Sequence, residues 1–111
     1  MKRILVATFA LSLTLTLPLL LLGAGDTGAG KKVYAKKCAT CHGKQGEGKP
    51  AIAKMMKVEL RHLGSKEVQA KSDEQLRKAT VEGVGKMKPV KGLSDEDVAN
   101  LIAYLRTLKR K

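Results

Sequence analysis

The five residues from Cys38 to His42 constrain this 111-residue chain more than any other stretch. They read Cys-Ala-Thr-Cys-His, and Cys-X-X-Cys-His is the attachment signature of a c-type haem. Two thiols one helical turn apart can each add to a vinyl group of the porphyrin, and the histidine that follows can offer an imidazole nitrogen to the iron. Cys38 and Cys41 are the only cysteines of the chain. The sequence therefore predicts one covalently bound haem, with His42 as its first axial ligand.

The cysteine pair has three other interpretations. A thioredoxin-like redox pair needs a setting of alternating strands and helices, and the sequence shows no such alternation. A zinc site needs about four ligands. The candidate zinc ligands are Cys38, Cys41, His42 and His62, although their spacing is unusual. The pair could also be purely structural. Haem is favoured because the rest of the chain supplies an export signal, short helices and a second candidate axial ligand.

The first 25 residues have the layout of a secretory signal peptide. Lys2 and Arg3 precede an apolar stretch over residues 4–22, and small residues follow at 23–25. We predict a signal peptide over residues 1–25, one domain over residues 26–111 and a periplasmic location, which agrees with haem attachment outside the bacterial cytoplasm. The alternative is a retained membrane anchor, although Pro18 and the small residues after it favour cleavage.

Residues 26–111 are strongly basic, with 20 lysines and arginines against 10 aspartates and glutamates. A net charge near +10 suggests partners with acidic surfaces, although the lysines could simply keep an exported protein soluble. Nucleic acid is not expected as a partner, because the chain is exported and has no DNA- or RNA-binding motif. A domain this small buries a limited core, so a haem would serve as its apolar centre.

Three helices with clear sequence signals are predicted between residues 26 and 111. The first covers residues 30–41 and carries both cysteines; Gly30 either allows a close crossing with another helix or marks the start of this one. The second covers residues 73–82, after a capping box that begins at Ser72. The third covers residues 95–109, with Ser94 as its N-cap and an apolar stripe at helical spacing. Residues 43–50 and 83–93 are predicted loops, residues 51–64 are predicted turns with one short helix, and no strand pattern is visible.

The second axial ligand decides what the iron can do, because a side chain that closes the iron suits electron transfer and an open position admits small molecules. The candidates are Met55, Met56, His62 and Met87. Met87 is favoured because it lies in a loop rich in glycine and proline, which can place a thioether over the haem without straining a helix. Met55 and Met56 are better explained as apolar packing against the haem. For His42, a backbone carbonyl near Pro50 is the candidate acceptor for the second ring nitrogen.

From Gly30 to about Leu108 the chain resembles a small bacterial class I cytochrome c. That family has a glycine eight residues and an aromatic residue four residues before the first cysteine, and an apolar and aromatic pair in the last helix. The residues that match the family are Gly30, Tyr34, Cys38, Cys41, His42, Met87, Leu101 and Tyr104. One departure is Lys88, which stands between Met87 and Pro89 where the family often has proline directly after the methionine. The resemblance implies an all-α cytochrome c fold of three to five short helices around one haem c, with axial ligation by His42 and Met87.

These features predict a monomeric periplasmic protein that shuttles single electrons between redox partners, and those partners are expected to have acidic docking surfaces. A membrane is expected as a partner only if residues 1–25 are retained. The alternative function is a haem-based ligand sensor or weak peroxidase with an open distal site. An enzyme is not expected, because no histidine or arginine is visibly placed for peroxide cleavage.

Overall fold

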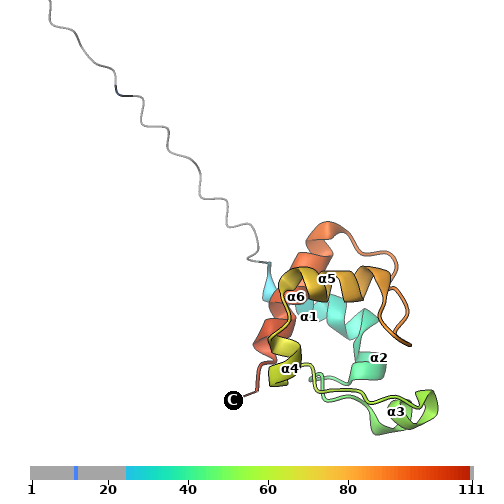
Figure 1. Cartoon of the computed structure of the whole chain (residues 1–111). Coiled ribbons are helices and arrows are strands. Elements are labelled where there is room, and N and C mark those ends of the chain that lie inside the picture. The colour runs from blue at the N-terminus through green and yellow to red at the C-terminus, as the bar shows by residue number, and fades with distance from the viewer. Residues whose placement is uncertain (1–11, 13–24, 111) are drawn as a thin grey trace, which may run out of the picture.

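A computed structural model describes Ser12 and residues 25–110, so the predicted signal peptide lies almost entirely outside the described residues. Within this part of the chain the structure has six helices and no strand beyond an isolated bridge between Val84 and Met87 (Figure 1). None of the described helices is long and apolar enough to cross a membrane. The all-helical fold class is confirmed. The count exceeds the predicted three to five helices because two of the six have only four residues each.

Helices α1 (Thr27–Lys37) and α6 (Asp95–Thr107) form the main helix pair of the fold. Their crossing explains Gly30, because a Cβ atom built on it would lie 1.9 Å from the carbonyl oxygen of Asn100 in α6. The prediction of a close crossing is therefore confirmed. The helix begins at Thr27, three residues earlier than predicted, because the Asp26 side chain accepts hydrogen bonds from the N–H groups of Gly28 and Ala29.

The core lies along one side of α6. Tyr34 and Leu101 are each only 1% exposed, and they pack in one cluster with Leu105. The Tyr34 and Tyr104 rings are 5.3 Å apart between centroids, at a tilted angle of 57°, which is a favourable geometry for an aromatic pair. A second cluster lies between α5 (Asp73–Glu82) and α6 and consists of Leu76, Val98 and Ile102.

The capping box predicted at Ser72 and the N-cap predicted at Ser94 set the starts of α5 and α6. The Ser72 hydroxyl accepts from the N–H of Gln75, while the Gln75 side chain accepts from the N–H of Ser72. Ser94 and Asp97 make the same reciprocal pair at the start of α6. Helix α5 has the predicted bounds, whereas α6 ends at Thr107, two residues before the predicted end.

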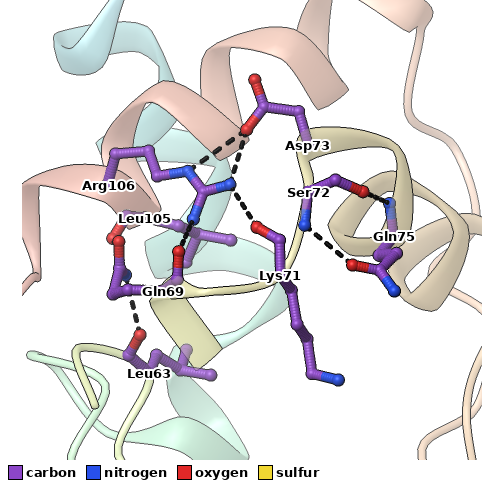
Figure 2. A network of polar contacts seen from close by, with 8 residues as sticks. All are labelled: Leu63, Gln69, Lys71, Ser72, Asp73, Gln75, Leu105 and Arg106. Carbon is purple, nitrogen blue, oxygen red and sulfur yellow. Dashed lines mark hydrogen bonds and ion pairs between the residues drawn. The ribbon is translucent and has the colours of Figure 1, made fainter. Parts of the chain in front are cut away.

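Helix α4 (Lys66–Gln69) was not predicted, and it is fixed by side chains from distant parts of the chain. Figure 2 shows the Gln69 amide donating to the carbonyls of Leu63 and Leu105, both at 2.9 Å. In the same view the Arg106 guanidinium of α6 donates to the carbonyls of Gln69 and Lys71 and pairs with the Asp73 carboxylate at 2.7 Å. This network holds the connection between α4 and α5 against α6.

Helix α3 (Pro50–Met56) stands apart from the α1–α6 pair in Figure 1, on the same side of the molecule as α2 (Ala39–His42). Proline at its first position suits a helix start. Its end is marked by Lys57, which has a left-handed φ of 53° and is the only described residue other than glycine with a positive φ. The predicted short helix within residues 51–64 is thus present, one residue earlier than expected.

Candidate functional site

The Cys-X-X-Cys-His motif lies at a break between two helices. Helix α1 ends at Lys37, and Cys38 then serves both as the C-cap of α1 and as the N-cap of α2. The carbonyl of Cys38 accepts from the N–H groups of Cys41 and His42, at 3.3 Å and 3.0 Å. The predicted single helix over residues 30–41 is therefore wrong at this point, because the chain turns at Cys38 and winds the motif into a separate turn.

The two thiols of the motif are free. Cys38 is half-buried and Cys41 is exposed, and no disulfide joins them. Burial raises the pKa of the Cys38 thiol to about 11. Two free thiols on one short turn satisfy the chemical requirement for two thioether bonds to one porphyrin.

His42 is half-buried at the end of α2. Burial lowers the pKa of its imidazole, so the ring is held neutral, which is the form that can bind a metal ion. Its Nδ1 atom is buried and has no hydrogen-bond partner among the described residues. The predicted bond to a carbonyl near Pro50 is therefore not made in this structure.

Hydrogen bonds on both sides fix the main chain around His42. The Tyr34 hydroxyl, buried in the core, donates to the carbonyl of Gly43 at 2.5 Å. The carbonyl of His42 accepts from the N–H of Gly48 at 2.7 Å, and the carbonyl of Cys41 accepts from the N–H of Lys49 at 3.0 Å. The sequence singled out Tyr34 only as the aromatic residue four positions before the first cysteine, and its hydroxyl bond was not predicted. The one available signal was the hydroxyl itself, because phenylalanine at this position would pack in the same way.

Met87 closes a tight turn, residues 84–87, which we call the Met87 turn. The N–H of Val84 donates to the carbonyl of Met87 at 3.0 Å, and the N–H of Met87 donates to the carbonyl of Val84 at 2.9 Å. Gly85 has a φ of 56°, the left-handed value that a two-residue hairpin loop needs at its first central position. The predicted loop over residues 83–93 therefore contains a small hairpin with Met87, half-buried, at its end.

The other candidate ligands are placed differently. The Met55 side chain is 68% exposed. Met56 is half-buried, and its carbonyl accepts a hydrogen bond from the Lys86 ammonium at 2.8 Å. The Nδ1 atom of His62 accepts from the N–H of Gly64 at 2.9 Å, so this ring nitrogen is engaged in a local turn.

The zinc interpretation is wrong. Among residues 25–110 no three histidine, cysteine, aspartate or glutamate side chains come close enough together to hold a metal ion. The four residues considered for zinc from the sequence, including His62, do not meet. The donor set on α2, with two free thiols and a neutral imidazole, fits a haem instead.

The excess of positive over negative charge lies on the segments around the motif and the Met87 turn. Residues 27–57 and 83–93 hold eleven lysines, all exposed, and a single acidic residue, Glu47. Residues 58–82 and 94–110, by contrast, hold eight basic and eight acidic residues. All four ion pairs of the described residues lie in this balanced part: Arg61–Glu67, Arg77–Glu74, Lys78–Glu82 and Arg106–Asp73. We call the lysine-rich part, residues 27–57 and 83–93, the basic surface.

The two segments of the basic surface meet in space. A Cβ atom built on Gly92 would lie 3.9 Å from the Lys37 ammonium at the end of α1. The Lys86 ammonium reaches the end of α3 at Met56. Residues 83–93 therefore lie beside the end of α1 and the end of α3.

Comparison with known proteins finds the same family by sequence and by structure. The family model of cytochrome c matches residues 28–109. Cytochrome c-554(547) of Halothiobacillus neapolitanus is 38% identical over 94 residues, which cover 78% of this chain and all of that protein. The solved structure of the c-type cytochrome KustC0563 is similar with a TM-score of 0.64 and 32% identity, over 73% of this chain and 98% of that one.

Proposed function

This chain belongs to the cytochrome c family, with covalently bound haem c and haem-based electron transfer, and on that premise we propose that it is a periplasmic electron carrier with His42 and Met87 as axial ligands. Cys38 and Cys41 would hold the haem through thioether bonds. When bound, the haem supplies an iron centre that can gain and lose one electron reversibly. The protein residues hold this centre, close its two axial positions and present it to partners.

The observation that carries the proposal is that α2 holds the His42 ring neutral and its main chain in a fixed position. His42 is neutral through burial. Its carbonyl accepts from the N–H of Gly48, and the carbonyl of the next residue, Gly43, accepts from the Tyr34 hydroxyl, so the imidazole needs little reorganisation to bind iron. A ligand held in one position in both oxidation states favours fast electron transfer, because few atoms move when the charge changes.

Met87 is the best supported second ligand. It is half-buried at the end of the Met87 turn, and the turn is connected through Lys86 to α3, which itself follows the motif directly. Met55 points largely to solvent, and His62 has one ring nitrogen engaged in its own turn. A thioether ligand in place of a second imidazole raises the reduction potential.

The test is the optical spectrum of the oxidised, haem-loaded protein. We expect a weak methionine–iron charge-transfer band in the far red, lost in Met87→Ala and retained in Met55→Ala, which removes an exposed methionine of the same size. Retention of the band in Met87→Ala would contradict the assignment. Absence of the band from the unmodified protein would point to His62 or to an open site, and binding of carbon monoxide and peroxide would then be measured.

The basic surface supports docking of acidic redox partners. All of the excess charge lies on the segments that carry the motif and the Met87 turn, so the attraction acts where the haem would be exposed. Opposite charge accelerates short encounters of this kind more than it strengthens them.

The charge effect can be measured with ferricyanide as an anionic electron acceptor. At low ionic strength we expect Lys37→Glu, on the basic surface, to slow oxidation of the reduced protein by about threefold. Lys109→Glu makes the same charge change in the balanced part of the chain and is expected to have a much smaller effect. Added salt should slow the unmodified protein and reduce the difference between the variants. Equal slowing in the two variants, or a rate that rises with salt, would contradict a localised basic docking surface.

A further inference from the structure

The Met87 turn has one hydrogen bond to the rest of the described molecule. Its two main-chain bonds join Val84 to Met87 and only close the turn on itself. The Val84 side chain is 61% exposed, so it does not anchor the turn in the core. The next connection along the chain is at Val90, whose N–H donates to the carbonyl of Thr80 at 2.8 Å. Between these points the link to another segment is the Lys86 ammonium, which donates to the carbonyl of Met56 at 2.8 Å.

The acceptor of this bond is well suited to a cation. Met56 is the last residue of α3, and the final carbonyls of a helix have no partner within the helix. They also carry the negative end of the helix dipole, which favours a positively charged donor. An ammonium group can therefore bind this carbonyl although both segments lie at the surface.

Helix α3 connects the two proposed ligands through this bond. Its start is held to the motif, because Gly48 and Lys49 donate to the carbonyls of His42 and Cys41 just before α3 begins. Its end accepts from Lys86, the residue before Met87. A continuous path of main chain and hydrogen bonds thus runs from the His42 turn along α3 to the Met87 turn.

We propose that Lys86 is a positioning residue, which holds the Met87 turn against α3 and so limits how often the Met87 thioether leaves the iron. This role rests on the proposed ligation by Met87. If the Lys86 bond opens, the turn keeps only its own internal bonds and is free to move away from α3. A small molecule that binds iron would then compete more successfully with Met87.

Imidazole binding to the oxidised, haem-loaded protein tests the role, because imidazole must displace Met87 and abolish the far-red band. We expect Lys86→Met to bind imidazole about two- to fivefold more tightly, as suits the loss of one solvent-exposed, charge-assisted hydrogen bond. Lys88→Met is the matched control: it makes the same change on the other side of Met87, and Lys88 is exposed with no hydrogen bond in the described structure. We expect Lys88→Met to bind imidazole with the affinity of the unmodified protein. Lys86→Arg can still donate to the carbonyl of Met56, so its imidazole affinity is also expected to stay close to that of the unmodified protein.

The outcomes separate this role from the proposed function. Equal imidazole affinities in Lys86→Met and Lys88→Met, with the band present, would overturn the positioning role and leave the Met87 ligation intact. A far-red band missing from the unmodified protein would overturn both. Equal thermal midpoints of the two variants would show that a difference in imidazole affinity arises at the Met87 turn and not from general destabilisation.

Discussion

Gly30→Ala is expected to destabilise the haem-loaded protein by about 3 kcal/mol, because overpacking against a rigid backbone is among the costliest single changes in a core. The new Cβ atom would lie 1.9 Å from the carbonyl oxygen of Asn100 and 2.9 Å from the Cβ atom of Tyr104. Neither contact can be relieved by rotating a side chain, so α1 and α6 must move apart. The helix propensity of alanine, which favours it by about 1 kcal/mol over glycine, offsets only part of this cost. Denaturant unfolding followed by circular dichroism measures the change.

Gly28→Ala is the matched control in the same helix. A Cβ atom there would meet only the Asp26 side chain, at 3.3 Å, and that side chain can shift. We expect its free energy of unfolding to stay within about 1 kcal/mol of the unmodified protein, because the gain in propensity opposes slight crowding of the cap. A similar small change in Gly30→Ala would mean that the α1–α6 crossing is looser than the structure shows.

The helices that the sequence predicted well are those with purely local signals. Helix α5 has the predicted bounds and α6 the predicted start because Ser72 and Ser94 each form a capping box with the residue three positions later. The close crossing at Gly30 was also predictable, since a glycine inside a helix costs stability and needs a reason. These signals lie within a few residues of the structure they specify.

The parts that sequence reasoning missed depend on residues far apart in the chain. Helix α4 has four residues and is held by Arg106 and Gln69 through bonds that span more than thirty positions. The bond from Lys86 to Met56 spans 30 positions. No local sequence pattern predicts such contacts, because a surface lysine or arginine looks the same in the sequence whether or not it donates to a carbonyl far along the chain.

The candidate site divides in the same way. The motif at residues 38–42 carries its chemistry in its spacing, and its assignment to haem agrees with the family to which the chain belongs. The break between α1 and α2 at Cys38 was not predicted, because the helical spacing of the apolar residues continues across it. The concentration of lysines on the segments around the motif became visible only when the fold brought residues 83–93 beside α1 and α3.

Tyr34→Phe is expected to lower the free energy of unfolding by about 2 kcal/mol, because it leaves the buried carbonyl of Gly43 without its hydrogen-bond donor. The ring and its packing against Tyr104 are kept, so the loss reports the hydroxyl bond. Tyr104→Phe is the matched control, since the Tyr104 hydroxyl makes no hydrogen bond to the described residues, and it is expected to change the free energy by less than about 0.5 kcal/mol. Equal losses in the two variants would contradict a specific role for the Tyr34 hydroxyl.

Tyr34→Phe and Tyr104→Phe also test how the stability that the Tyr34 hydroxyl provides depends on pH. Burial, and to a smaller extent the nearby Glu47 carboxylate, raise the pKa of Tyr34 above its ordinary value of 10.0. The folded state therefore keeps the Tyr34 proton at a pH where the unfolded chain has lost it, so the stability from this group is fully present below pH 10 and declines as the pH rises further. The decline is at most about 1.4 kcal/mol per pH unit for one group.

We expect the difference in unfolding free energy between the unmodified protein and Tyr34→Phe to shrink above pH 10, while the difference for Tyr104→Phe changes much less. A difference for Tyr34→Phe that stays constant from pH 8 to pH 11 would mean that the Tyr34 hydroxyl titrates as it does in water, and that the carbonyl of Gly43 is not held in a dry part of the core.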